Sequence, residues 1–355
     1  MSARARPQER HFMDSRYRLY GVLGSPYAAK LRAIFRYRHI PFSWIPASFD
    51  WVPGMDLVRP ELAQVTPRII PVVWFPGDES YHVDSTAIAY RLERHHPARS
   101  IVPDNPGLAF LSHLLEDMGD EWLLKVAFHY RWSNEVDRNF TNRLVMSEVL
   151  GGGVPQDRIE AASRAFRDRQ IARMPLVGCT PQNAPLIAEV YRRVLDAMTD
   201  LRASSSFLFG TRPSLGDFGV FGALFTCRND PTPGAIMRDR SPASLDWIQT
   251  LDEASGVDGA WVASTDDLSG ATTDLLRLAG ETYLPFLLAN EAAIEHGREK
   301  VSLTMLGMPY AQAPFRYQAK CLRWLRQEFE ALSGAARAQT MALLRETGCG
   351  AAFGI

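Results

Sequence analysis

The sequence predicts a small α/β domain followed by a larger all-helical domain. Two observations support this division. Between Tyr17 and Leu92, short β-forming segments alternate with helical ones, whereas from Leu108 onward apolar residues recur at helical spacing and no strand pattern is visible. The chain has 355 residues, which is enough for two domains with a sizeable core.

The first unit of the α/β domain is a strand that leads into a helix. Arg18–Gly21 contains β-formers and ends in glycine. Ser25 then reads as the N-cap of a helix, with Pro26 at its first position, and Phe42–Ile45 reads as the next strand. Because free N–H groups and the helix dipole favour an anion at a helix N-terminus, Ser25 is a plausible place to hold a thiolate.

Two further strands and a helix complete this domain. Ile69–Phe75 is an apolar run with Pro71 near its start, which suits a strand end or a cis turn, and we expect the Ile70–Pro71 bond to be cis. Tyr81–Val83 forms the last strand, after which Asp84-Ser85 caps a helix.

In this order, the segments LYG…SPYxxKxR, IPVV and DSTAIAYRLE resemble the N-terminal domain of glutathione transferases, and FLFG…PSLGDF in the second half resembles the buried helix start of their C-terminal domain. The resemblance implies a thioredoxin-like glutathione-binding domain over residues 16–97. A linker (98–107) and an all-helical domain (108–355) with a C-terminal extension would follow, and residues 1–15 would form a disordered arm.

The resemblance also assigns candidate site residues. Ser25 would hydrogen-bond the glutathione sulfur and lower its pKa, as in serine-type members. Ile70, ahead of Pro71, would offer its backbone to the cysteinyl residue. Asp84 and Ser85 would bind the γ-glutamyl ammonium and carboxylate, although the family usually has Glu-Ser here. The remaining substrate-binding candidates are Arg68, for the glycyl carboxylate, and Tyr27.

Tyr20 is the alternative to Ser25, because other classes of the family use a tyrosine at the end of the first strand. The position of Ser25 before Pro26 and a helix follows the serine-type pattern, whereas Tyr20 could point into the core. Ser25 could equally be a plain N-cap with no part in chemistry.

Two functions follow from the resemblance. The first is a glutathione-dependent transferase that activates the thiolate for attack on a small hydrophobic electrophile, by conjugation or by thiolysis of an ether or halide. The alternative is a non-catalytic binding or scaffold module that acts through its extended helical domain. The long extension and the basic Arg158–Arg173 segment keep this alternative open.

The second half contains one strong local signal and one long unassigned segment. Ser214 and Asp217 form an S-x-x-D capping box, to which we assign a structural role. The resemblance thins after Gly256, yet helices are expected over Thr282–Ala293, Pro314–Leu332 and Ala335–Glu346. An apolar stripe in the second of these is expected to pack in the core: Tyr317, Cys321, Trp324, Leu325 and Phe329.

Four acidic residues lie close together in the first helix of the second half: Glu116, Asp117, Asp120 and Glu121. Paired carboxylates can ligate metals or act as acid and base. We favour a solvated acidic face, or partners for the arginines of the chain. No metal-ligand spacing is present.

The net charge of −1 argues against nucleic-acid binding. The four cysteines are scattered, which fits buried thiols in a reducing compartment. No apolar stretch has the character of a secretion signal or the length of a membrane span, so we expect a cytoplasmic protein without membrane contact. The resemblance implies a possible homodimer, unless the extra C-terminal helices cover the dimer surface.

Overall fold

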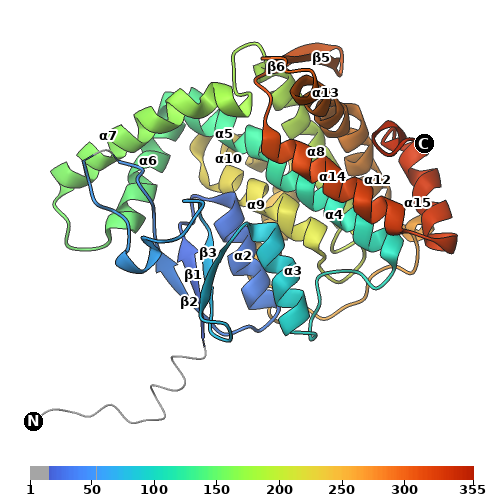
Figure 1. Ribbon diagram of the computed structural model, residues 1–355, viewed down its shortest axis with the longest axis horizontal. Coiled ribbons are helices and arrows are strands. Elements are labelled where there is room, and N and C mark those ends of the chain that lie inside the picture. Colours follow the sequence, from blue (N-terminus) through green and yellow to red (C-terminus); the bar gives the residue numbers. More distant parts are fainter. Residues whose placement is uncertain (1–15, 53) are drawn as a thin grey trace, which may run out of the picture.

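We describe the protein from a computed structural model, which covers residues 16–52 and 54–355. The arm predicted for residues 1–15 lies outside the described residues. The α/β domain and the helical domain pack against each other along α2 (Pro26–Tyr37) and α9 (Leu215–Asn229) (Figure 1).

The N-terminal domain is built on a four-stranded mixed sheet of order β2-β1-β3-β4. β1 pairs with β2 in parallel and with β3 in antiparallel, and β3 pairs with β4 in antiparallel. The third strand is shorter than the run Ile69–Phe75 suggested. Its pairing begins at Val72, because the proline at 71 has no N–H to donate to the ladder. The elements of the domain are β1 (Tyr17–Gly21), α2 (Pro26–Tyr37), β2 (Phe42–Pro46), η1 (Pro60–Leu62), β3 (Val72–Phe75), β4 (Ser80–Val83) and α3 (Ser85–His95).

The C-terminal domain is dominated by helices. Two of them, α4 and α9, approach closely: a Cβ at Gly119 would lie 2.4 Å from the backbone of Gly219, so glycine is needed at this crossing. Up to the point where the resemblance thins, the helices are α4 (Pro106–Glu121), α5 (Leu123–Ser133), α6 (Glu135–Leu150), α7 (Gln156–Arg173), η2 (Met174–Val177), α8 (Ala184–Ser204), α9 (Leu215–Asn229), α10 (Pro231–Arg240) and α11 (Pro242–Asp252).

The C-terminal extension continues this domain and packs on α4 (Figure 1). Its elements are η3 (Thr265–Asp267), α12 (Gly270–Leu278), η4 (Ala279–Tyr283), α13 (Leu284–Glu295), β5 (Val301–Met305), β6 (Met308–Gln312), α14 (Arg316–Ala331), α15 (Gly334–Glu346) and η5 (Gly350–Phe353). The expected stripe on α14 is buried at Cys321, Leu325 and Phe329, as predicted, but Tyr317 lies at its edge and makes a polar contact described below.

One feature of the extension contradicts the sequence prediction of helices only. β5 and β6 form an antiparallel hairpin, with Met305 opposite Met308. Leu306 and Gly307 make its two-residue turn, both with positive φ, as such a turn requires. The pattern was missed because an isolated hairpin of this length is a weak sequence signal.

The predicted capping box is present at the start of α9. The Ser214 hydroxyl accepts from the Asp217 N–H, and the Asp217 carboxylate accepts from the Ser214 N–H at 2.9 Å and from the Leu208 N–H at 2.8 Å. Both side chains are fully buried. The pair therefore ties the preceding loop to the helix.

Candidate functional site

The start of α2 is held in place by the helical domain. The N–H of Leu23 donates to Glu148 Oε2 of α6 at 2.9 Å, and Arg131 of α5 donates to the Gly24 carbonyl at 2.6 Å. A side chain at position 24 would collide with Val145, because its Cβ would lie 2.5 Å from a Val145 methyl carbon. The loop that carries Ser25 is therefore fixed by both domains.

Ser25 is the N-cap of α2, as predicted, and Pro26 follows at the first position. Its hydroxyl oxygen accepts from the Ala28 N–H at 3.4 Å. Because the oxygen acts there as an acceptor, the O–H proton remains available for an anion at the helix N-terminus. The geometry suits a sulfur contact as well as a cap.

Tyr20, the alternative, lies on the other face of the sheet. Side chains alternate along a strand, and Leu19 packs with the helices while Tyr20 packs in a separate cluster with Phe49 and Leu62. Tyr20 is fully buried, and this burial raises the pKa of its hydroxyl above the ordinary value. Tyr20 therefore points into the core of the domain.

The start of α3 carries the second pair of candidates. Asp84 is the N-cap, with the unusual φ of 75°, and its Oδ1 accepts from the Ala87 N–H at 3.3 Å. Ser85 is buried, and its hydroxyl donates to Asp120 Oδ2 at 3.2 Å. Positive φ at a residue other than glycine costs energy and persists only where the surrounding structure fixes it.

Ile70 and Pro71 lie where β3 begins, and the bond between them is cis, as predicted. Pro71 is buried, whereas Ile70 is half-buried and lies outside the ladder, which starts at Val72. Ile70 packs against the cluster that contains Val22, from the loop before Ser25. Ile70 also packs against the cluster that contains Tyr20, so its side chain lies between two apolar clusters of the domain.

Arg68 is exposed and pairs with Asp50 on the loop after β2. A glycyl carboxylate at this position would compete with Asp50 for the guanidinium. Among the candidate residues, Arg68 is thus the one that already forms an ion pair within the described residues.

Tyr27 and Ser85 meet at one residue of α4. The Tyr27 hydroxyl donates to the Asp120 carbonyl at 3.1 Å, while the Ser85 hydroxyl donates to the side chain of the same residue. The N-termini of α2 and α3 therefore converge on the C-terminal end of α4. Two helix N-termini in one place favour a ligand with more than one negative group.

Below this convergence lies a buried ionic cluster, which corrects the prediction of a solvated acidic face. The Lys30 ammonium of α2 pairs with Glu116 and, at 2.6 Å, with Asp120. Thr86 donates to Glu116 at 2.6 Å. α4 is covered by the N-terminal domain on one side and by the extension on the other, so these carboxylates have a lysine partner rather than solvent or arginine.

Side chains of the C-terminal extension donate hydrogen bonds to the other two acids of the cluster, Asp117 and Glu121. Tyr283 donates to Asp117 at 2.7 Å, and Gln318 donates to Glu121 at 3.1 Å. Sequence reasoning missed this arrangement. The signal for it was a single lysine on an otherwise apolar face of α2, together with four acids inside an apolar stripe.

Within the cluster, two carboxylates, those of Glu116 and Asp120, share the single ammonium of Lys30. This arrangement and the burial of the three groups determine their pKa values. Burial opposes the charge on Lys30, but Asp120 and Glu116 outweigh it and raise the pKa of Lys30. Burial raises the pKa of Asp120 to about 7, against the lowering effect of Lys30. Near neutral pH, Asp120 is therefore partly protonated in the folded state and ionised in the unfolded state.

We expect the free energy of unfolding to fall as pH rises from 6 to 8. A carboxyl whose folded-state pKa is raised stabilises the fold below its unfolded pKa and loses this contribution as pH rises through the folded value, here about 7 for Asp120. The loss should be about 1–2 kcal/mol over this range. Thermal melts at both pH values measure it. Asp120→Asn should reduce the dependence by this amount but not abolish it, because the raised pKa values of Glu121, about 8, and His113, about 9, act in the same direction. Asp274→Asn at an exposed site should leave it unchanged. An equal slope in all three proteins would contradict this ionisation.

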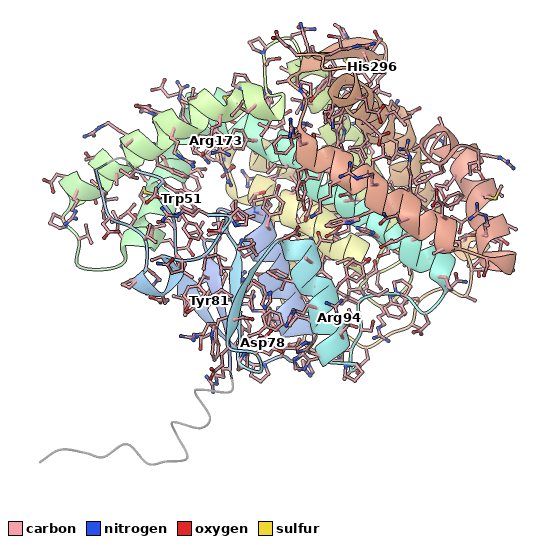
Figure 2. All side chains as sticks on the ribbon, viewed as in Figure 1. Trp51, Asp78, Tyr81, Arg94, Arg173 and His296 are labelled. Atoms are coloured by element: carbon pink, nitrogen blue, oxygen red, sulfur yellow. The ribbon has the colours of Figure 1, made fainter. Side chains whose placement is uncertain are left out.

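An apolar cluster packs against the loop before Ser25, through Val22 and through Val145, which meets Gly24. It joins the loop before α2 to α5, α6 and α7, and Trp51 stacks on Phe166 of α7 with ring centroids 5.4 Å apart. Figure 2 shows Trp51 where its loop meets α7. The buried members of the cluster are Val22, Val52, Trp132, Val145, Met146, Ala162 and Phe166.

The four cysteines are free and buried, as expected. In the part of the chain that the structure describes, no three His, Cys, Asp or Glu side chains are grouped so that they could hold a metal ion. No helix of that part is long and apolar enough to cross a membrane.

Comparison with known proteins agrees with this architecture. A family model described as "Glutathione S-transferase, N-terminal domain" matches residues 19–100, and the model of the corresponding C-terminal domain matches residues 159–250. The chain belongs to the glutathione transferase superfamily. The fold is the one expected, a small mixed-sheet domain followed by a large helical domain. No curated protein matches the chain.

Solved structures with a similar fold include three transferase-like proteins. A glutathione S-transferase of Methylobacterium radiotolerans, in complex with glutathione sulfonate, is 20% identical over 70% of this chain and 98% of its own, with a TM-score of 0.41. The β-etherase LigF of Sphingobium is 16% identical over 66% and 94%, with a TM-score of 0.44. A transferase of Phanerochaete chrysosporium in complex with oxidised glutathione is 14% identical over 68% and 94%, with a TM-score of 0.41.

Proposed function

We propose that the protein is a glutathione-dependent transferase that uses the thiolate of glutathione to attack a small hydrophobic electrophile. The observation that carries this proposal is the convergence of two helix N-termini on Asp120, one capped by Ser25 and the other by Asp84. The cis bond at Ile70–Pro71, at the head of β3, also supports it.

In this proposal the Ser25 O–H donates to the glutathione sulfur, and the N-terminus of α2 adds its dipole. Both favour the thiolate over the thiol, so the thiol pKa falls from about 8.5 towards neutrality. The thiolate then forms a sulfur–carbon bond with the electrophile, and the leaving group departs with its electron pair. We infer that the hydrophobic substrate would bind near the apolar cluster around Trp51 and Phe166, because its member Val145 contacts the loop that carries Ser25.

The rest of the tripeptide would be held at the start of α3 and β3. Asp84 would pair with the γ-glutamyl ammonium, while Ser85 and the free N–H groups of α3 would receive the carboxylate. Ile70 would bind the cysteinyl backbone. Tyr27 and Arg68 would complete the contacts, Arg68 in competition with Asp50. The homodimer and the cytoplasmic location remain predictions.

The experiment that tests this function is calorimetry with millimolar glutathione. We expect the unaltered protein to bind, and Asp84→Ala and Ser85→Ala each to weaken binding by about 1–3 kcal/mol, because charged groups of the ligand lose their partners. Asp274→Ala, which removes an exposed carboxylate on α12, should bind as the unaltered protein does. Absence of heat with the unaltered protein would contradict the function and favour a non-catalytic module.

A further inference from the structure

The C-terminal extension reaches the predicted glutathione site through one side chain. Tyr317, in the first turn of α14, donates its hydroxyl to Asp84 Oδ2 at 3.0 Å. The two residues are 233 positions apart, and they belong to different domains. This contact therefore depends on how the extension is docked.

The start of α14 is anchored firmly enough to fix Tyr317. Asn290 of α13 is fully buried and binds Phe315 twice: its amide donates to the Phe315 carbonyl at 3.0 Å and its oxygen accepts from the Phe315 N–H at 2.8 Å. One residue beyond Tyr317, Gln318 donates to Glu121 at the end of α4. Lys320 covers the Tyr317 ring, with its ammonium 5.4 Å from the ring centroid.

The Asp84 carboxylate needs a hydrogen-bond donor that fixes its second oxygen. Its backbone has a φ of 75°, and its Oδ1 is used to cap its own helix at 3.3 Å. Oδ2 is therefore the oxygen that remains available to a ligand, and it already accepts a hydrogen bond from the Tyr317 hydroxyl. A carboxylate oxygen has two lone pairs, so Oδ2 can accept from Tyr317 and from an ammonium together. Burial and the neighbouring Asp84 raise the pKa of Tyr317, which keeps its hydroxyl a donor at neutral pH.

We propose that Tyr317 is a positioning residue of the glutathione site, which holds the Asp84 carboxylate in place for the γ-glutamyl ammonium. The extension is then a part of the site and determines specificity for a ligand with a free α-amino group. This inference rests on the proposed function, because it takes glutathione as the ligand.

The test is calorimetry of Tyr317→Phe with glutathione and with its analogue that lacks the α-amino group. We expect the dissociation constant for glutathione to rise about tenfold, the effect of losing one hydrogen bond to a charged group. Binding of the analogue should not change, since it has no ammonium for Asp84 to hold. In steady-state assays KM for glutathione should rise while kcat stays the same.

Two further variants separate positioning from a general effect on the fold. In an Asp84→Asn background, Tyr317→Phe should cause no additional loss of affinity for glutathione. Tyr283→Phe is the control, because it removes another tyrosine hydroxyl of the extension, one that donates to Asp117 in the buried ionic cluster. It should leave the affinity for glutathione unchanged. Unchanged or tighter glutathione binding in Tyr317→Phe, or an equal loss for both ligands, would overturn the inference. Absence of glutathione binding by the unaltered protein would instead contradict the proposed function, so the two failures are distinguishable.

Discussion

Ser25→Ala should raise the pKa of the bound glutathione thiol by about one to two units. A hydrogen bond to an anion contributes about 1.5–3 kcal/mol, and each pKa unit corresponds to about 1.4 kcal/mol. Affinity for glutathione should remain nearly intact, because the start of α3 and Ile70 would hold the rest of the tripeptide. The ultraviolet thiolate band of the complex, titrated against pH, measures this pKa.

The loss of the N-cap itself has to be separated from the loss of the sulfur contact. Removal of a serine cap costs about 1 kcal/mol of stability, which a thermal melt detects. Ser25→Thr keeps a hydroxyl at the cap and should retain the lower thiol pKa. A titration in Ser25→Ala that matches the unaltered protein would remove Ser25 from the mechanism.

Lys30→Met should destabilise the protein by about 3–5 kcal/mol, because it leaves two buried carboxylates without their cation. Glu116 and Lys30 are fully buried and Asp120 is 7% exposed, so water cannot replace the ammonium without opening the interface. The loss should be smaller at pH 5 than at pH 8, since protonation neutralises Asp120. Denaturant unfolding at the two pH values measures both effects.

Two control variants make the Lys30 result specific. Lys300→Met removes an exposed lysine and should change stability little. The double variant Lys30→Met with Asp120→Asn should recover part of the lost stability, because one of the unpaired charges is gone. If Lys30→Met unfolds at the same denaturant concentration as Lys300→Met, the cluster does not stabilise the domain interface.

The local features of the N-terminal domain could be predicted from the sequence because each depends on neighbouring residues. A Ser-Pro pair before an apolar helix predicts an N-cap, and Ser25 has that role. The same holds for the cis bond at Pro71 and, in the helical domain, for the Ser214–Asp217 capping box. In these cases the residues that determine the structure lie within a few positions of each other.

The contacts that could not be predicted join residues far apart in the chain. Lys30 and Asp120 are separated by 90 positions, and nothing in either segment indicates its partner. Tyr317 read as one more member of an apolar stripe, because periodicity places a residue on a face but does not identify what that face meets. The β5–β6 hairpin is the exception: its strands are neighbours in the chain, but an isolated hairpin with five-residue strands gives only a weak sequence signal.

The most direct test of the central claim is a pH titration of the thiolate band with glutathione bound to the unaltered protein at saturation. The proposed site predicts an apparent thiol pKa well below the free value of about 8.5 and close to neutrality. S-methylglutathione, which has no ionisable thiol, should show no such band. Saturable binding with a thiol pKa equal to that of free glutathione would contradict the account.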